Sequence, residues 1–538
     1  MINDLNLIDT EQISIDTQLC IIGAGTAGLF LGHRLRSLGV RVLNLEAGSL
    51  VSQTPQALGQ QCFQMGMPYR GSDVGRSFGL GGTSVLWGGQ LIPVSPSDMA
   101  NRFLPELDAW PVTYDEIFPY FSKVKQNFGL SCNTSSDDLA LIQNKFPDLA
   151  NLSPEFKLRL SEWLPFKTRN FSRAFSSEIE TDPEWNIWIN AEVLDLLHSS
   201  NSGRNFITKV KAVSKTGKQL EVKAETFVIS AGTLESTRIL LEFDEASDGL
   251  ISRNGSPLGR YFADHISATC GKLTCHDWRS YNLATAPIFS SGVMRSPRLE
   301  LTSSAQKKLN TYSAFAHLPF VTRGNTGFDV VRSFLRKRQG EQIKVGIAST
   351  GIAKVVSDIS SIMFWRGVHR RLWIPQDADL FLQVDAEQVP NWDSRLFLSD
   401  VIDTHGRKRL AIDWRIKQED IDLLGTTANL IRDSWEVSLL GKVAELDLNL
   451  PNLTNNFEAL YDVYHPTGTL RMGSSPKTSV VDQNLKLWAI ENCFVSSTAV
   501  FPFPGSANPG LTHLALTTRL ADYIAQLTVK RRIDLVSP

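Results

Sequence analysis

The chain has 538 residues, of which 42% are hydrophobic and 20% are charged. This length exceeds what one hydrophobic core usually supports, so we expect a soluble protein of two or more domains. The formal net charge of −2 excludes an overall electric field that would recruit nucleic acid or an anionic membrane.

The cysteines and the first residues indicate the compartment. Six cysteines are scattered without a CxxC pair or a second pair of ligands, so we expect reduced thiols and no metal site. The first residues lack a basic region followed by an apolar one, so we expect no signal peptide. We find no apolar run that predicts a membrane span. Together these features predict a cytoplasmic protein.

The pattern Gly-x-Gly-x-x-Gly at 23–28 follows an apolar strand at 19–22 and precedes a helix. In this arrangement one glycine allows a tight turn, one lets the backbone approach a pyrophosphate, and one lets the helix pack on the strand. The helix amino end then offers free N–H groups and the positive end of its dipole to the phosphates. The next strand, at 40–45, ends in Glu46, whose carboxylate can accept hydrogen bonds from ribose hydroxyls, which argues against NADP.

Two further features favour FAD over NAD. A second glycine-rich loop, at 79–89, is dense enough in glycine for its backbone to pass close to a flat ligand. A strand that ends at Ala231-Gly232 suits an elongated cofactor that crosses the sheet. Either feature alone could be an ordinary turn, but with the first glycine loop they predict a flavin site.

A histidine lies among glycine and threonine residues at 464–473, and the segment 506–512 follows it with the run Ser-Ala-Asn-Pro-Gly-Leu-Thr. Alone, this is a loop that contains an imidazole. A neutral imidazole with a pKa near 7 can accept the proton of a hydroxyl group while hydride leaves the carbon that bears this hydroxyl. With the glycine loops, the segment predicts a flavin enzyme that takes hydride from an alcohol.

These motifs resemble the glucose-methanol-choline (GMC) oxidoreductases, and most closely the branch with pyranose oxidases, flavin-dependent sugar dehydrogenases and cholesterol oxidase. The resemblance runs in islands from 18 to 528 and includes 110–120, 259–265, 387–396 and 494–522. It implies an α/β FAD-binding Rossmann-like domain interleaved with an α+β substrate domain, in which a mixed or antiparallel sheet is backed by helices.

The resemblance also implies roles for single residues. His465 matches the active-site histidine, the expected general base, and Asn508 matches the second catalytic position, which would hold the substrate oxygen. Pro509 and Gly510 would open a helix whose amino end faces the flavin and stabilises its negative charge after reduction. Val193 matches a backbone contact to the adenine.

Most of the expected FAD contacts lie in the glycine loops. The full set is Gly23, Gly25, Thr26, Ala27, Gly28, Glu46, Ala47, Gly81, Gly82, Thr83, Ser84, Trp87, Gly88, Gly89, Val193, Ala231, Gly232, Ala499, Asn508, Pro509 and Gly510. Pyranose oxidases with covalently attached flavin have a histidine where this chain has Leu86. We therefore expect FAD to be bound non-covalently.

The two expected domains alternate along the chain. The FAD-binding segments are 1–95, 188–261 and 461–538, and the substrate segments are 96–187 and 262–460. Beyond the first strand–helix–strand unit, the sequence predicts strands at 189–194, 206–214 and 219–230 and helices near 234–242 and 511–528. Residues 266–385 match no part of the family pattern, although they would form much of the substrate wall.

Other conspicuous residues have more than one interpretation. His265, His317 and His513 could each line the active site, but an isolated histidine is more often structural. A zone rich in arginine and aromatic residues, at 332–373, could dock a membrane surface or an electron acceptor. Solvated helix faces are the preferred interpretation of this zone.

The sequence thus predicts oxidation of a small-molecule alcohol, foremost a secondary hydroxyl of a sugar, glycoside or other polyhydroxylated compound. Oxygen or another electron acceptor would reoxidise the flavin, and the sequence leaves the oligomeric state open. The alternatives are a lyase or flavin photoenzyme on the same fold, an oxidase of sterols or other hydrophobic alcohols, and a flavoprotein without catalysis.

Overall fold

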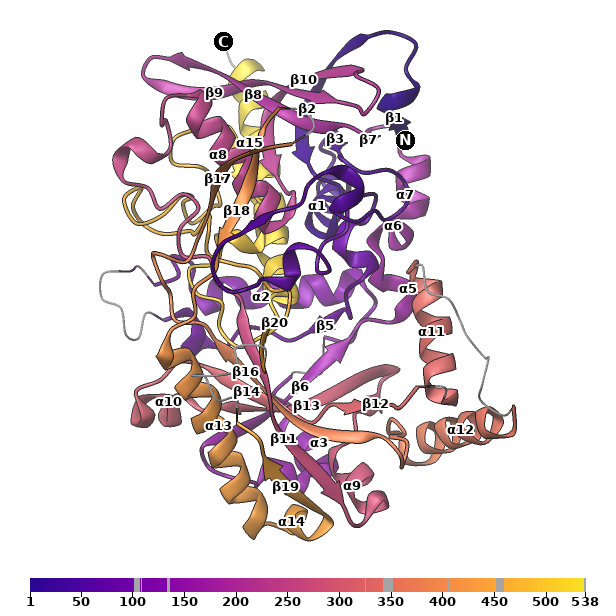
Figure 1. Cartoon of the computed structure of the whole chain (residues 1–538). Helices are drawn as coiled ribbons and strands as arrows, with labels where there is room; N and C mark the ends of the chain where they lie inside the picture. The colour runs from indigo at the N-terminus through magenta and orange to yellow at the C-terminus, as the bar shows by residue number, and fades with distance from the viewer. Residues whose placement is uncertain are drawn as a thin grey trace.

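The computed structural model describes residues 1–100, 107, 109–132, 136–324, 326–341, 352–403, 406–450 and 459–536. Two large β-sheets lie one above the other in Figure 1, the first at the end of the molecule that holds the N-terminus. None of the described helices is long and apolar enough to cross a membrane. All six cysteines are free, and Cys20, Cys270 and Cys493 are buried.

The first sheet has the strand order β1-β7-β3-β2-β10-β9-β8, and β21 also pairs with β10. The strands are β1 (Ile2–Asp4), β2 (Gln12–Ile22), β3 (Val42–Leu45), β7 (Trp185–Ile189), β8 (Glu192–Asn201), β9 (Arg204–Val213), β10 (Gln219–Ile229) and β21 (Cys493–Val495). Neighbouring strands in the series β1-β7-β3-β2-β10 pair in parallel, and so do β10 and β21. The pairs β10–β9 and β9–β8 are antiparallel. Every residue of β3 is buried, as expected where helices and loops cover both faces of a parallel sheet.

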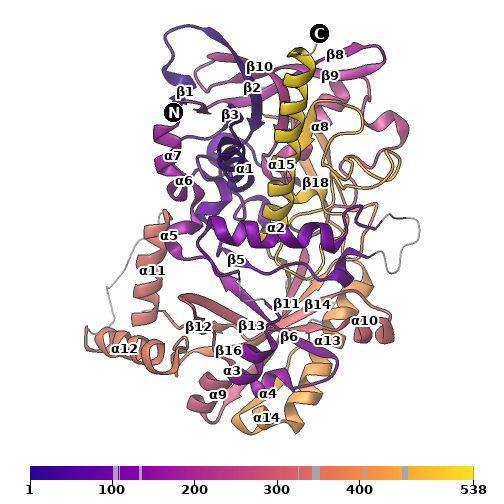
Figure 2. The same cartoon turned by 180° about the vertical axis from the view of Figure 1, so that it is seen from behind.

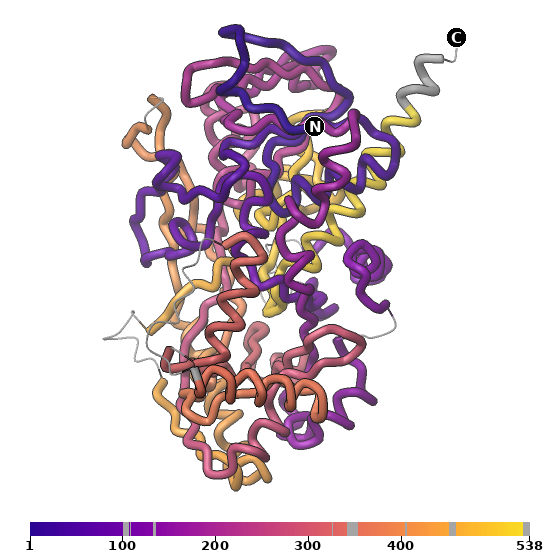
Figure 3. The backbone as a smooth tube through the Cα atoms, turned by 90° about the vertical axis from the view of Figure 1, so that its right-hand side faces the viewer, coloured from indigo at the N-terminus to yellow at the C-terminus, as the bar shows by residue number. Residues whose placement is uncertain are grey.

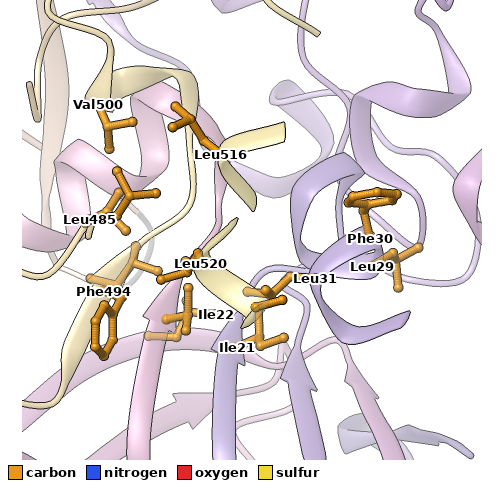
Figure 4. Close-up of a cluster of buried hydrophobic side chains, with 14 of the residues drawn as sticks. Ile21, Ile22, Leu29, Phe30, Leu31, Leu485, Phe494, Val500, Leu516 and Leu520 are labelled. Atoms are coloured by element: carbon orange, nitrogen blue, oxygen red, sulfur yellow. The ribbon is translucent and has the colours of Figure 1, made fainter. Parts of the chain in front are cut away.

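Helices α1 (Thr26–Ser37) and α15 (Gly510–Val536) contact each other beside this sheet. Figure 4 shows Ile22 of β2, Leu31 of α1 and Leu520 of α15 in one apolar cluster, and each of these side chains is buried. The core therefore joins segments that are almost 500 positions apart in the sequence, roughly the whole chain.

The predicted strand at 189–194 is wrong, because two strands meet there. β7 ends at Ile189 and β8 begins at Glu192. Asn190, between them, has a φ of 53°, a left-handed conformation that asparagine adopts more readily than most residues. The turn at Asn190 moves the chain from the parallel part of the sheet to its antiparallel part.

The other predicted elements are confirmed. The strands predicted at 206–214 and 219–230 are β9 and β10. The helix predicted near 234–242 is α8 (Gly232–Ala246), and the one predicted near 511–528 is α15. Both helices are longer than expected at both ends.

The second sheet is antiparallel throughout its described pairs, with the order β19-β11-β16-β14-β13-β6-β5. These strands are β5 (Gln90–Leu91), β6 (Phe156–Trp163), β11 (His265–Cys275), β13 (Val293–Leu301), β14 (Ala314–His317), β16 (Asp379–Glu387) and β19 (Ala444–Leu448). Helix α13 (Gln418–Val437) contacts β11, β14, β16 and β19 and covers one face. The expected architecture, an α/β Rossmann-like domain with a sheet domain backed by helices, is therefore confirmed, while the domain bounds stay a prediction.

The chain passes repeatedly between the two sheets, and Figure 3 shows early and late segments mixed in both halves of the molecule. Helix α2 (Tyr114–Asn127) lies between the sheets in Figure 2 and contacts α15. Helices α11 (Gly327–Gln339) and α12 (Ile352–Phe364) lie together at one side of the second sheet (Figure 1). This interleaving brings distant segments to the space between the sheets.

Candidate active site

A cavity of about 680 Å³ lies where the carboxyl ends of β2, β3 and β10 approach the second sheet. Its volume is in the usual range for a site that holds a small molecule or cofactor. It is lined by residues of both glycine loops and by His465 and Asn508. The two motifs that carry the sequence prediction therefore border one continuous space.

The first glycine loop leaves no room for side chains at two positions. Gly23 has a φ of 112°, and a Cβ there would lie 2.4 Å from the carbonyl oxygen of Ser230. A Cβ at Gly28 would lie 2.2 Å from the carbonyl oxygen of Gly23. These contacts pack the start of α1 tightly against β2 and β10, as a dinucleotide-binding turn requires.

Gly25 differs, because it lies against the second glycine loop and a Cβ there would only touch it. Its nearest neighbour for an added Cβ is the Cα of Gly82, at 3.7 Å. The hydroxyls of Thr26 and Thr83 are 3.2 Å apart and join the same two loops. Since Gly25 is also the amino cap of α1 and supplies no side-chain cap, N–H groups at this helix end are available to phosphate oxygens.

Glu46 ties the glycine loops together through backbone hydrogen bonds. Its carboxylate accepts from the N–H groups of Ala24, Gly48 and Gly79, each at 2.9 Å. Burial raises the pKa of this carboxyl group, and the three N–H donors oppose that shift. A carboxylate has about four acceptor sites, so one further bond, such as that predicted from a ribose hydroxyl, is compatible with the geometry.

The expected FAD contacts divide into two groups. The cavity wall includes Gly23, Gly25, Thr26, Ala27, Glu46, Ala47, Gly82, Thr83, Trp87, Gly88, Gly89, Val193, Ala231, Gly232, Asn508, Pro509 and Gly510. Gly28, Gly81, Ser84 and Ala499 are not part of the wall. Ser84, for example, accepts a hydrogen bond from the N–H of Phe171 and donates one to the Gly81 carbonyl, so it supports the loop from behind.

His465 faces a second histidine. Its Nδ1 lies 3.2 Å from Nδ1 of His265, the first residue of β11. Asp264 accepts from the backbone N–H of each of these histidines at 2.7 Å and from the hydroxyl of Tyr69 at 2.7 Å. One buried carboxylate therefore fixes the spacing of both imidazoles, an arrangement that no sequence pattern indicates beyond the presence of His265.

Both imidazoles are neutral near neutral pH. Burial lowers the pKa of His265 to about 4, and burial with the nearby His265 and Arg298 lowers the pKa of His465 well below its usual value. Two neutral rings that meet through Nδ1 share one proton, so one ring donates and the other accepts. When His465 is the donor, its Nε2 carries a free lone pair.

The substrate side of the cavity is lined by side chains that the sequence did not single out as a group. They are Phe315 and His317 of β14 with Gln383 and Asp385 of β16. Gln383 donates to Asp385 at 3.1 Å, and Nε2 of His317 lies 3.8 Å from the same carboxylate. Gln383 and Asp385 lie two positions apart in β16, so their side chains share one face of the strand. This spacing of polar residues in a largely apolar strand is the sequence signal that could have identified them.

The remaining candidates have mixed outcomes. His513, one turn into α15, also lines the cavity, and so does Leu86. In the zone at 332–373, Arg366 and Arg370 are exposed, as expected of solvated helix faces. Arg371 is buried and donates to the carbonyl of Ala286 at 2.8 Å, so the expectation is wrong there, because this side chain fixes a loop of the second sheet.

Two family models match parts of the chain. One described as GMC oxidoreductase matches residues 390–517, and one described as FAD binding domain matches residues 16–71. The first match contains both His465 and Asn508, and the second contains the first glycine loop.

Curated relatives are similar over long stretches at low identity. The chain is 23% identical to a 2-methyl-1,2-propanediol dehydrogenase of Mycolicibacterium austroafricanum in an alignment of 494 residues that covers 83% of this chain and 80% of that protein. It is 20% identical to a 6'''-hydroxyparomomycin C oxidase of Streptomyces lividus, over 94% of this chain and 91% of that one. A C-glycoside 3-oxidase of Arthrobacter globiformis is 30% identical over 143 residues, 26% of each chain.

Solved structures share the fold. A pyridoxine 4-oxidase from Mesorbium loti superposes with a TM-score of 0.59 at 16% identity, over 94% of this chain and 99% of that one. A formate oxidase gives a TM-score of 0.57 at 14% identity, over 96% and 99%. The cavity suits FAD, because glycines of both loops (Gly23, Gly25, Gly82, Gly88 and Gly89) line it with backbone that a flat, elongated cofactor can approach closely. The chain belongs to the GMC family and is an FAD-dependent oxidoreductase that acts on alcohols.

Proposed function

We propose that the enzyme oxidises a hydroxyl group of a polyhydroxylated small molecule, such as a sugar or glycoside, to a carbonyl with His465 as the general base. The observation that carries the proposal is that His465 and Asn508 line the same cavity, together with a polar group of side chains. His465 and Asn508 come from separate segments, 43 positions apart, and both border the space that the glycine loops open.

The protein residues handle the proton and the orientation of the substrate. When bound, FAD supplies the acceptor for the hydride that leaves the alcohol carbon. Nε2 of His465 accepts the hydroxyl proton, and a base of this kind typically accelerates the reaction about 10²–10⁴-fold. Asn508 holds the substrate oxygen so that the C–H bond is directed toward the cofactor.

The substrate wall favours a polyhydroxylated compound over a sterol or another hydrophobic alcohol. His317, Gln383 and Asp385 line the cavity, and Nε2 of His317 has no hydrogen-bond partner in the described protein, so a hydrophobic alcohol would leave it unsatisfied. The names of two relatives, a 6'''-hydroxyparomomycin C oxidase and a C-glycoside 3-oxidase, support the same substrate class. We further propose that FAD is held without a covalent bond, because Leu86 offers no nucleophile.

A substrate screen tests the proposal against its alternatives. The purified yellow protein is mixed anaerobically with polyols, sugars, glycosides and sterols, and the flavin absorbance is followed. Loss of absorbance with a sugar or glycoside is the expected result, and oxygen, a quinone and a dye are then compared as acceptors. Turnover without bleaching, or only under light, would instead support a lyase or a photoenzyme on this fold.

A further inference from the structure

Arg298, on β13, lies directly behind Asn508. Its side chain donates from Nη1 to Oδ1 of Asn508 at 2.5 Å and from Nη2 to the carbonyl oxygen of Ser506 at 3.1 Å. The centre of the guanidinium group lies 3.2 Å from the centroid of the Phe315 ring, and only 2% of the residue is exposed. Arg298 therefore has a fixed position between the substrate wall and the start of α15.

This cation has no carboxylate partner within salt-bridge distance in the described part of the chain. Two other buried arginines of the same sheet are paired, Arg295 with Glu162 at 2.8 Å and Arg159 with Glu300 at 2.9 Å. Removing a cation from water without an opposite charge is costly, so a position that keeps one is a candidate for a functional role. Burial lowers the pKa of Arg298 to about 9, which leaves it charged at neutral pH.

The contact decides which way the Asn508 amide is turned. Arginine carries only donors, so the atom that faces Arg298 must be the amide oxygen. The amide nitrogen then has its two N–H groups available, and no hydrogen bond to an acceptor in the described protein uses them. Because Asn508 lines the cavity, it can offer the substrate donors only.

We propose that Arg298 is a positioning residue that locks Asn508 as a donor-only partner of the oxygen of the reacting alcohol. This inference rests on the proposed function and adds a division of roles to it. Asn508 stabilises the negative charge that develops on the substrate oxygen, and His465 alone accepts its proton. The charge of Arg298 also lowers the pKa of His465, which agrees with a base that stays neutral.

A double-mutant cycle tests the proposal with the substrate found in the screen. Arg298→Met, Asn508→Ala and the double variant are compared in the anaerobic rate of flavin reduction at saturating substrate. Arg298→Met should slow reduction about 10- to 100-fold, the effect of losing a charge-assisted hydrogen bond. In the Asn508→Ala background the same change should have little further effect, because the amide that it positions is gone.

Two more variants separate positioning from a structural role. Asn508→Asp keeps an oxygen for Arg298 but loses the N–H donors, so it should slow reduction at least as much as Arg298→Met. Arg298→Lys keeps one charged donor and should recover part of the rate. Arg295→Met, which removes a buried and paired cation from the same strand, is the matched control and should lower Tm without a comparable loss of rate.

Equal slowing by Arg298→Met in both backgrounds would overturn the proposal, and so would a wild-type rate in Asn508→Asp. If Arg298→Met does not fold, the cycle is run with Arg298→Lys, and Asn508→Asp tests the donor role without any change at Arg298. A wild-type flavin that no alcohol reduces would contradict the proposed function, whereas additive losses in an active enzyme contradict only the role of Arg298.

Discussion

Two parts of the cavity lining are built in different ways. We call the part made by the glycine loops the FAD end, and the part made by His465, Asn508 and the polar side chains of β14 and β16 the substrate end. The FAD end is made largely of backbone from the two glycine loops, held by one carboxylate, Glu46, through three N–H groups. The substrate end is made of side chains from strands that pair across the second sheet, where Phe315 lies opposite Asp385 and His317 opposite Gln383. A site built from backbone depends on glycines such as Gly23, where a Cβ would clash with neighbouring backbone, whereas a site built from side chains can be changed one group at a time.

The strongest test of this difference adds a side chain at the FAD end. Gly25→Val should abolish FAD binding, because Gly25 lines the cavity at the amino end of α1, where the pyrophosphate is expected, and a branched side chain there would crowd both Gly82 and the cofactor. The purified variant should be colourless by absorbance and still show the circular dichroism of a folded protein. Gly367→Val, at a glycine with no atom within 4 Å of an added Cβ, is the control and should stay yellow.

At the substrate end, the largest expected effect is that of His465→Ala. Flavin reduction by the substrate should slow about 10²–10⁴-fold, since a general base is lost. FAD content should stay normal, because the imidazole pairs with His265 and makes no hydrogen bond to the glycine loops in the described structure. His276→Ala, at an exposed histidine that is not part of the cavity wall, serves as the control. Reduction at the wild-type rate in His465→Ala would remove the proposed mechanism.

A smaller effect is expected from a change at His317, one of the polar side chains that β14 and β16 contribute to the cavity. His317→Ala should weaken substrate binding about 5- to 20-fold, the range for one lost hydrogen bond to a neutral or partly charged group. The rate of reduction at saturation should change little, because His317 lies on the substrate wall and has no part in the proposed proton transfer. Titrating the reduction rate against substrate concentration separates the two quantities, with His198→Ala on β8 as the control. A fall in the saturated rate alone would assign His317 a different role.

The smallest expected effect concerns acid stability. Burial lowers the pKa of His513 to about 4, below the usual value of about 6.5. Between these values the unfolded chain binds a proton that the folded chain does not, so this group makes stability rise with pH in that window. His513→Gln should therefore lose less Tm than wild type when the pH falls from 7 to 4.5. Parallel Tm curves for the two proteins would show that His513 titrates normally.

The contrast between the two ends also explains what the sequence could predict. The glycine loops need a fixed spacing within one strand–helix unit, so the pattern at 23–28 predicts their geometry directly. His465 and Asn508 are recognised because each lies in a distinctive run of residues. The contact between Arg298 and Asn508 spans 210 positions and depends on how β13 packs against the start of α15, so no local pattern carries it.

The division of β7 from β8 was missed for another reason. Both strands are apolar near Asn190, and the break depends on one residue with a positive φ, which asparagine allows but does not require. The substrate wall was missed because its residues belong to the segment 266–385, where only the pairing of β14 with β16 brings polar side chains to one face.

The pairing of β21 with β10 also has a consequence during synthesis of the chain, because the two strands are made far apart in time. β10 is complete at Ile229, but Phe227–Ile229 pair with β21, which begins at Cys493, 264 positions later. At the usual speed of translation, roughly 13 to 53 s pass before this partner exists. For that interval the nascent chain carries an unpaired apolar strand edge, the kind of surface that promotes aggregation. The yield of active enzyme in a production host should therefore depend on chaperone supply and translation rate as much as on the stability of the finished fold.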